Sequence, residues 1–443
     1  RLVLRSRSRE DRRPPSYLEV ANRVTREFAA ASGGTPLNLL PESVAGLSVT
    51  AHILGGAAIG RDATAGVVDA GHEVAVVVSA MGHTTDELIA LAKRVNPRPP
   101  FRELDLLTTT GEQVSVALLS MQLWAMGIPA KGFVQHQIGI TTDGRYGDAR
   151  ILEVNPARIR EALEQGFVAV IAGFMGTTPE GEITTLGRGG SDTTAVAIAA
   201  ALGAKECEIY TDTEGVYTTD PHLIPEARKL SVIGYDQMLE MAALGARVLH
   251  PRAVYYAKRY GVVLHVRSSF SYNPGTLVKE VAMEMDKAVT GVALDLDHAQ
   301  IGLIGIPDQP GIAAKVFQAL AERGIAVDMI IQGVPGHDPS RQQMAFTVKK
   351  DFAQEALEAL EPVLAEIGGE AILRPDIAKV SIVGVGLAST PEVPAKMFQA
   401  VASTGANIEM IATSEVRISV IIPAEYAEAA LRAVHQAFEL DKA

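Results

Sequence analysis

Between about residues 73 and 266 the sequence alternates short apolar runs with longer segments of helical period, and this alternation restricts the fold more than any other feature. The runs EVAVVVSAMG, FVAVIAGFMGTT, ECEIYTDTEGVY and GVVLHVRSS have the length and composition of buried strands. Helical periodicity separates them, as in TDELIALAKRV, GEQVSVALLSMQLWAMG, NPARIREALEQG and SDTTAVAIAAALGA. Strands that alternate with helices predict a mainly parallel sheet that helices cover on both faces. We therefore expect an α/β domain here.

The predicted strands end in residues suited to phosphate. In open α/β sheets, ligands bind beyond the carboxyl ends of the strands. Here those ends read SAMGHTT, GFMGTTPEG and YTDTEGVYTTDP. Gly, Thr and Asp present backbone N–H groups and small hydroxyls to anions. The sequence therefore predicts a ligand site along this edge.

After residue 290 the chain repeats itself. AAKVFQALAERGIAVDMI (313–330) matches PAKMFQAVASTGANIEMI (394–411) at a fixed offset of 81 residues. A strand and turn precede each copy, and a strand and helix follow it, which predicts a β-α-β-β-α-β unit twice. A duplicated small domain behind a larger α/β domain suggests a regulator attached to a catalyst. A structural dimerisation module is the alternative.

Composition excludes several classes of function. The chain has 443 residues, which predicts two or three domains, and a net charge of −12, which leaves no basic footprint for nucleic acid or a membrane surface. The single cysteine, Cys207, allows neither a disulfide framework nor a cysteine-rich zinc site. We see no apolar run of membrane-spanning length and no secretory signal, so we expect a cytoplasmic protein.

The stretch TTLGRGGSDTTAVAIAAALGA (184–204) places glycines, one arginine and one aspartate before an apolar helix. We expect Asp192 to cap a helix that begins near Thr193, with Thr194 bonding its first turn. A helix N-terminus favours an anion, and Arg188 adds a planar fork of donors suited to a carboxylate. The alternative is an ordinary capped helix with a solvated arginine.

Four motifs together resemble the aspartokinases, the amino-acid kinases that phosphorylate the side-chain carboxylate of aspartate. They are TTLGRGGSDTTA, TTGEQVS, YTDTEGVYTTDP and ARVLHPRAV, and the doublet of repeats is similar to the paired ACT domains of that family. The resemblance covers about residues 73 to 440. It implies a mainly parallel sheet sandwiched by helices (residues 73–285), followed by two ferredoxin-like α+β ACT domains (290–365 and 366–443).

The resemblance also implies an activity. It would be ATP-dependent formation of 4-phospho-aspartate, the first step of lysine, threonine and methionine biosynthesis, with feedback regulation through the ACT domains. Magnesium would accompany ATP, and no metal site formed by the protein alone is expected. Such catalysis rests mostly on positioning and on cationic groups around the phosphoryl oxygens.

The family motifs assign roles to individual residues. The catalytic residues would be Arg188 and Asp192, and Glu112 would face the substrate ammonium group while Arg188 and Ser191 hold the rest of aspartate. Arg247 stands where many relatives carry a lysine at the nucleotide phosphates. The nucleotide contacts implied are Thr211, Asp212, Tyr217, Asp220, Pro221, His222 and Arg247. The alternatives are a helix-terminal acid at Glu112 and a turn former at Asp220.

Each repeat places a turn before a helix N-terminus, which is a site for an amino-acid carboxylate. The implied effector is threonine or lysine, and the chain is expected to form a homo-oligomer through its ACT domains. The residues implied in effector binding are Asp308, Gln309, Pro310, Gly311, Ile312, Ala313, Val327, Asp328 and Gln332, with Asn407 and Ile408 in the second repeat. A plain Pro-Gly turn is the alternative for DQPG (308–311).

The front of the sequence departs from the family. Aspartokinases begin with a strand and a Lys-Phe/Tyr-Gly-Gly-Thr-Ser loop at the phosphates, whereas the first lysine here is Lys93. Residues 38–74 instead resemble the C-terminal part of glucose–methanol–choline oxidoreductases, with His52 at their active-site histidine. No Gly-x-Gly-x-x-Gly fingerprint precedes it, so oxidoreductase chemistry is excluded.

We therefore expect residues 1–72 to be foreign to the kinase, which would lack its first strand and phosphate loop. The alternative function is a non-catalytic amino-acid-binding regulatory protein or subunit.

Overall fold

The computed structural model describes residues 2–3, 73–245, 248–281, 288–333 and 341–442. The described residues do not include His52, Arg247 or residues 38–72 of the stretch that resembles the oxidoreductases. The chain divides into two compact units. The first unit comprises Arg1–Val216, Lys229–Ala242 and Arg247–Val281, and the second unit comprises Tyr217–Arg228, Ala243–Ala246 and Ala282–Ala443.

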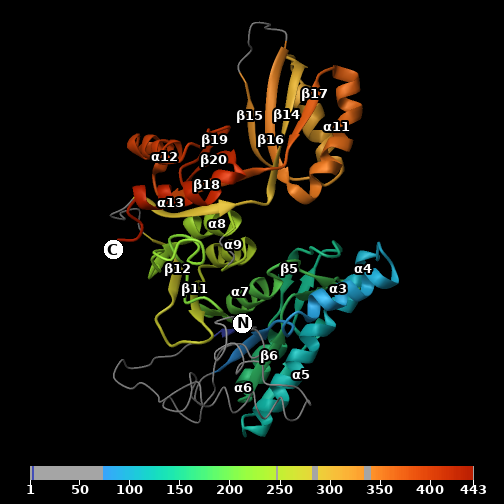
Figure 1. The fold of residues 1–443 in the computed structure, drawn as a ribbon. Coiled ribbons are helices and arrows are strands. Elements are labelled where there is room, and N and C mark those ends of the chain that lie inside the picture. Colours follow the sequence, from blue (N-terminus) through green and yellow to red (C-terminus); the bar gives the residue numbers. More distant parts are fainter. Residues whose placement is uncertain (1, 4–72, 246–247, 282–287, 334–340, 443) are drawn as a thin grey trace. The chain divides into compact units, whose positions relative to one another are not determined.

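The first unit is built on a mainly parallel sheet of four strands (Figure 1). Its strand order is β1 (Leu2–Val3), β2 (Ala75–Val78), β6 (Val168–Ala172) and β3 (Ala130–Phe133). β2, β6 and β3 run parallel, and β1 pairs antiparallel with β2. Every residue of β2 and β6 is buried, which is typical of a parallel sheet covered on both faces.

Helices supply that cover. The helices in contact with this sheet are α5 (Thr110–Ala125), α6 (Ala157–Glu164) and α7 (Gly190–Leu202), whereas α3 (Thr84–Val95) packs on α4 (Phe101–Thr108), which in turn contacts α5. Residues 190–199 of α7 are all buried, and after Thr194 this Ala-rich helix has no polar face to turn toward water. The α/β class expected from the alternation of strands and helices is confirmed.

Two further four-stranded sheets complete the first unit. One has the order β5 (Ile151–Val154), β4 (Ile140–Thr142), β7 (Met175–Thr177) and β8 (Ile183–Thr185). The other has the order β10 (Val232–Gly234), β12 (Thr276–Lys279), β11 (Val263–Ser268) and β9 (Glu206–Thr211), with α8 (Tyr235–Ala243) and α9 (Pro251–Tyr260) beside it in sequence. β9 and β11 run parallel, as the sequence predicted for their apolar runs.

The second unit contains two four-stranded antiparallel sheets with the same layout. The first repeat forms β14 (His298–Pro307), α10 (Ile312–Glu322), β15 (Val327–Gln332), β16 (Arg341–Lys349), α11 (Ala353–Ile367) and β17 (Glu370–Arg374). Its strand order is β15-β16-β14-β17, and its two helices contribute to a single core with the sheet. This is the complete β-α-β-β-α-β unit that the repeat predicted.

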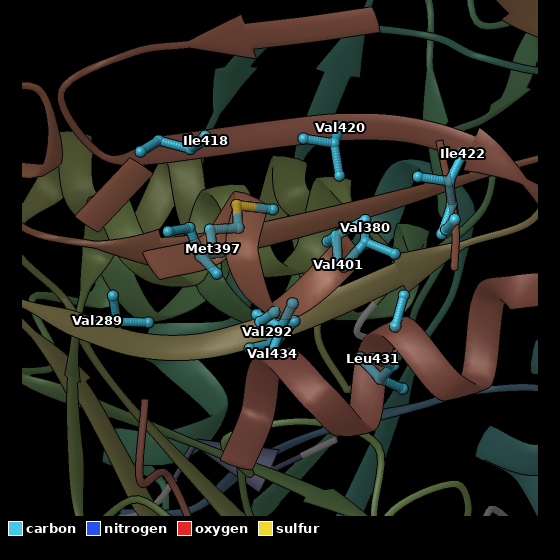
Figure 2. Close-up of a cluster of buried hydrophobic side chains, with 14 of the residues drawn as sticks. Val289, Val292, Val380, Met397, Val401, Ile418, Val420, Ile422, Leu431 and Val434 are labelled. Carbon is cyan, nitrogen blue, oxygen red and sulfur yellow. The ribbon is translucent and has the colours of Figure 1, made fainter. Parts of the chain in front are cut away.

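The second repeat takes its fourth strand from an earlier part of the chain. Its own elements are β18 (Ile377–Gly384), α12 (Glu392–Ala402), β19 (Met410–Thr413), β20 (Arg417–Pro423) and α13 (Ala427–Ala437). β13 (Val289–Asp295) pairs antiparallel with β18, in the place that β17 has beside β14. Figure 2 shows its Val292 packed beside Val434 of α13.

This pairing differs from the expected boundaries at 290–365 and 366–443. Residues 289–295 belong to the second sheet although they precede the first repeat, and residues 370–374 belong to the first sheet. The first ACT-like unit is therefore inserted between two strands of the second. The repeat implied a strand after the second helix of each copy, but no strand was predicted at 289–295, and strand pairing is a long-range choice.

A buried ion cluster joins the two sheets of the second unit. The Lys379 side chain is 3% exposed, and its Nζ lies 2.7 Å from Asp328 Oδ2 and 3.4 Å from Asp295 Oδ2. His298 Nδ1 lies 3.0 Å from the same Asp295 oxygen. Burial acts to raise the pKa values of both aspartates, but hydrogen bonds from His298 and the Asp297 N–H, with the charge of Lys379, hold the pKa of Asp295 below its ordinary range. The charge and hydrogen bond of Lys379 lower the pKa of Asp328 in the same way. Within the described residues, no helix is long and apolar enough to cross a membrane.

Candidate functional site

Glu112 is a buried carboxylate at the edge of the parallel sheet. It lies in the first turn of α5, is 3% exposed, and its Oε1 accepts a hydrogen bond from the Ala80 N–H at 3.1 Å. Its Oε2 is buried and has no hydrogen-bond partner among the described residues. Burial raises the pKa of Glu112 from 4.5 to about 7. An acid buried with one oxygen unpartnered fits a cationic ligand better than a helix-terminal acid facing water.

The motif TTGE explains how the helix comes this close. A Cβ atom on Gly111 would lie 2.8 Å from the Cβ atom of Ala80, so only glycine fits against the end of β2. The same approach brings the next residue, Glu112, within reach of the Ala80 N–H.

Ser191 of α7 packs against the end of the neighbouring strand, β6. The Gly173 N–H, just past β6, donates to the Val78 carbonyl of β2 at 2.9 Å. A Cβ atom on Gly173 would lie 2.6 Å from Ser191 Oγ, so the start of α7 packs directly on this strand end. Glu112 and Ser191 are thus held at the carboxyl ends of two adjacent parallel strands, where α/β sheets bind ligands.

The structure corrects the expected helix start. α7 begins at Gly190, and its N-cap residue Gly189 is in the left-handed region with φ 66°. Asp192 therefore lies inside the first turn and is not the N-cap, although it still adds negative charge there. Thr194 Oγ1 accepts from the Phe174 N–H at 3.2 Å and so bonds the β6–β7 connection, not the first turn.

Arg188 is the exposed cation of this loop. Among the described residues it forms no ion pair or hydrogen bond that would commit its guanidinium. Ser191 and Asp192, by contrast, are buried. The loop thus combines an available cation, a small hydroxyl and a helix N-terminus, which together suit a carboxylate or phosphoryl group.

Two residues outside the predicted set fix the position of this loop. Asp105 of α4 is buried, and its Oδ2 accepts from the N–H groups of Gly147 and Thr185, each at 2.9 Å. Its Oδ1 accepts from Thr185 Oγ1 at 2.8 Å. Arg252 Nη1 donates to the Leu186 carbonyl at 2.8 Å, immediately before Gly187. Asp105 therefore ties the helix pair that carries Glu112 to the strand that leads into Arg188.

Sequence reasoning missed both residues for different reasons. Arg252 lies inside the quoted motif ARVLHPRAV, so its place was marked but its partners were not. Asp105 offers only a weak signal, an acidic residue among leucines two helical turns before Glu112.

The residues implied in nucleotide binding belong to different units. Thr211 ends β9 in the first unit, and its Oγ1 donates to Asp212 Oδ1 at 3.0 Å. Tyr217, Asp220, Pro221 and His222 belong to the second unit. Asp220 Oδ1 accepts from the His222 N–H at 2.9 Å, which is the turn-forming role considered for it. Arg247 lies outside the described residues.

The first effector turn is only partly available to a ligand. Asp308, Gln309, Pro310 and Gly311 are exposed, and Gly311 has φ 94° as the N-cap of α10. The structure corrects the expectation that the Ile312 side chain faces an effector, because this side chain is buried in the core of the first repeat. Ala313 packs against the same core. This site can offer backbone N–H groups and the exposed turn, but not the side chain of Ile312.

The remaining effector residues differ in availability. The Asp328 carboxylate is already paired with Lys379, and Val327 is half-buried. Gln332 Nε2 donates to Gln342 Oε1. In the second repeat Asn407 is exposed, while Ile408 packs against the core. The structure therefore leaves Asn407 free to meet a ligand and gives Asp328 a structural partner.

One further cluster has ligand-type side chains. Glu206, Glu208 and His265 place ligand atoms within 4.8 Å of one another on β9 and β11. Arg267 Nη1 lies 3.0 Å from Glu208 Oε1, and Tyr210 donates to Glu208 Oε2 at 2.8 Å. The arginine already supplies the positive charge that a metal ion would bring.

Comparison with known proteins gives consistent matches. The profile of the amino acid kinase family matches residues 54–268, and the ACT domain profile matches residues 301–364 and 380–438. The kinase match begins within the stretch that resembles the oxidoreductases. An aspartokinase of Thermus thermophilus is 99% identical over 373 residues, which cover 84% of this chain and 92% of that protein. An aspartokinase of Mycolicibacterium smegmatis is 48% identical over 377 residues, covering 84% and 89%.

Solved structures agree. Aspartokinase III of E. coli in complex with aspartate and ADP, in its R-state, has a TM-score of 0.68 at 27% identity and covers 80% of each chain. The T-state of E. coli aspartokinase III, in complex with lysine and aspartate, has a TM-score of 0.65 at 26% identity. It covers 84% of this chain and 93% of that one.

Proposed function

The chain belongs to the aspartokinase family, and from this membership we propose that it transfers the terminal phosphoryl group of ATP to the side-chain carboxylate of aspartate. The product would be 4-phospho-aspartate. The observation that carries the proposal is the buried Glu112 with its unpartnered oxygen, at the same sheet edge as the Gly187–Ser191 loop. A cation site beside an anion site is what a zwitterionic amino acid requires.

In the proposed complex the ionised Glu112 binds the substrate ammonium group, and Arg188 pairs with the α-carboxylate. Ser191 and the first N–H groups of α7 then face the side-chain carboxylate or the phosphoryl group in transfer. Asp192 lies in the same turn of α7 and would orient groups there. The protein supplies position and charge and little covalent chemistry.

Nucleotide binding is proposed at the carboxyl end of β9 and in the segment that follows. Thr211 and Asp212 would contact the phosphates, with Tyr217 and the turn at Asp220–His222 at the base and ribose. Arg247 would add a cation there. Mg²⁺ bound with ATP would neutralise phosphate charge, and the exposed carboxylate of Asp212 is an oxygen ligand of the kind that Mg²⁺ prefers.

The two ACT domains are proposed to bind threonine or lysine and to mediate a homo-oligomer in the cytoplasm. For effector binding we retain the exposed turn 308–311 and Asn407. We also propose that residues 1–72 do not supply the lysine-containing phosphate loop of relatives, so that turnover by this sequence is slow.

Aspartate binding tests the proposal without depending on turnover. Calorimetry on the full chain should detect aspartate and ADP separately. Arg188→Ala should weaken aspartate binding by about 2–5 kcal/mol, the usual cost of truncating one partner of an enclosed charge pair, with ADP affinity unchanged. Arg158→Ala is the matched control, because Arg158 is an exposed arginine on α6. If Arg188→Ala left aspartate affinity intact, the substrate assignment would be wrong.

A further inference from the structure

The segment 217–228, to which the proposed function assigns nucleotide contacts, is packed as part of the regulatory body. It groups with residues 282–443 in the second unit, although the chain on both sides belongs to the first. Its ends are fastened in the first unit, where the Leu230 N–H donates to the Val216 carbonyl at 2.8 Å. The segment is therefore an excursion of the kinase chain whose conformation is determined in the regulatory unit.

Thr218 anchors this excursion. It is 0% exposed, and its carbonyl accepts from the Val292 N–H of β13 at 2.7 Å. Its Oγ1 accepts from the Arg228 N–H at 3.0 Å and lies 3.0 Å from His435 Nε2 of α13. Thr218 thus joins the two ends of the excursion to each other, to β13 and to α13.

Further contacts extend the same attachment. Ile224 is buried in the core cluster that contains Val292 and Val434, two side chains that Figure 2 shows close together. Arg432 of α13 donates to the Leu223 carbonyl at 3.3 Å and pairs with Glu226 at 3.5 Å. Apolar contacts therefore attach the excursion to the core of the second repeat, and polar contacts attach it to α13.

His435 is the buried polar member of this attachment. It is 1% exposed, and burial lowers the pKa of its imidazole, which favours the neutral form of the ring. A histidine that only filled the core could form its hydrogen bond with any nearby polar group. This one is paired with the residue between Tyr217 and the turn at Asp220, so a shift of α13 moves the segment's backbone directly.

We propose that His435 is a positioning residue for the nucleotide: through Thr218 it holds the 217–222 backbone in its binding conformation and transmits changes in the second ACT domain to nucleotide affinity. The inference rests on the proposed nucleotide role of this segment. Since coupling between two ligands is reciprocal, an effector that changes ADP affinity must have its own affinity changed by ADP in the same ratio.

The test compares His435→Leu with His435→Gln in the full chain, because the glutamine side chain can place a hydrogen-bonding atom near the position of Nε2. We expect His435→Leu to raise the Kd for ADP about fivefold to tenfold, the value of one buried hydrogen bond. Aspartate affinity should stay within about twofold, since the Glu112 and Arg188 contacts are untouched. His435→Gln should restore most of the ADP affinity.

Leu360→Ala is the matched control for general destabilisation. Leu360 lies in the core of the first repeat and does not belong to the core cluster that holds residues 217–228. The variant should therefore leave the affinities for ADP and for aspartate unchanged. Threonine and lysine are then titrated with and without ADP. Any coupling seen in the unmodified chain should be reduced in His435→Leu and recovered in His435→Gln.

Several outcomes would overturn the inference. If the unmodified chain binds ADP and His435→Leu binds it equally well, His435 is a core residue only, and the proposed function stands. Equal loss of ADP and aspartate affinity in His435→Leu would indicate general damage instead. If His435→Leu does not fold, Thr218→Val against Thr218→Ser makes the same comparison from the other side of the bond. A chain that binds neither ADP nor aspartate would contradict the proposed function itself.

Discussion

Replacing Glu112 by glutamine should remove a pH dependence from both stability and aspartate binding. The variant keeps an oxygen acceptor for the Ala80 N–H but removes the buried charge. In the native chain the pKa of Glu112 is raised from 4.5 to about 7, because burial disfavours the carboxylate. A shift of about 2.5 units corresponds to roughly 3 kcal/mol of free energy, at 1.36 kcal/mol for each unit.

The sign of the stability effect follows from linkage. The folded-state pKa lies above the unfolded value, so this stabilisation is fully present below about pH 4.5 and is lost as the pH rises through about 7. The free energy of unfolding of the native chain, relative to Glu112→Gln, should therefore fall by roughly 3 kcal/mol between pH 4 and pH 8. Trp124 is the single tryptophan and lies in the same helix, α5, so its fluorescence reports urea unfolding of this unit.

Aspartate binding should show the opposite trend. With a pKa of about 7, Glu112 is about one-tenth ionised at pH 6 and about nine-tenths ionised at pH 8. Only the carboxylate attracts the substrate ammonium group, so affinity should rise about tenfold across this range, and binding at pH 6 should release close to one proton. Calorimetry in two buffers of different ionisation enthalpy measures both quantities.

Glu103→Gln is the control, because it removes an exposed carboxylate from the adjacent helix α4. It should change neither trend. If the native chain binds aspartate equally at pH 6 and pH 8, or if Glu112→Gln keeps the pH dependence, Glu112 does not contact the ammonium group. A pH-dependent stability with a flat binding curve would leave Glu112 a structural acid.

Three further predictions follow from the same structure. Asp105→Asn should destabilise the first unit by about 1–3 kcal/mol in urea unfolding followed by Trp124 and should weaken aspartate binding, because an amide cannot accept at both oxygen positions; normal stability and affinity would contradict its positioning role. Lys379→Met should cost about 3–5 kcal/mol at pH 7, since it removes the cation from Asp295, whose side chain is 11% exposed, and from the more exposed Asp328. Because the pKa values of both aspartates are lowered in the native chain, this difference in thermal stability should shrink as the pH falls below about 4, and a constant difference would refute the ion-pair explanation. Replacing the first 70 residues by a strand ending in Lys-Tyr-Gly-Gly-Thr-Ser should raise turnover of aspartate and ATP by about 10²-fold or more, and equal rates would show that the present front segment is a working substitute.

Much of the fold was accessible from the sequence because the signals are local. Apolar runs of strand length, helical periodicity and the repeat at 313–330 and 394–411 each report on neighbouring residues alone, and the α/β class and both ACT-like units followed from them. The resemblance singled out the motif TTGE, but only the structure shows why it needs glycine, through the 2.8 Å separation that a Cβ atom on Gly111 would have from Ala80.

Local signals gave an incomplete account of helix ends and turns. Asp192 was expected to cap α7, but Gly189 in the left-handed region starts the helix earlier and places Asp192 in the first turn. Ile312 was expected to face an effector, yet the helical phase of α10 directs it into the core. In both cases the residue type was compatible with either environment, and packing selected between them.

Long-range choices were decided only by the tertiary structure. The sequence of β13 does not reveal that this strand pairs with β18, although the whole first repeat lies between the two in the chain. Nor does the sequence reveal that residues 217–228 pack in the same unit as α13. The ionisation of Glu112 and the charges around Lys379 depend on burial and on partners that lie far away along the chain. A sequence specifies which residues can bond, whereas desolvation and strand pairing depend on which surfaces meet, and those surfaces exist only once the chain has folded.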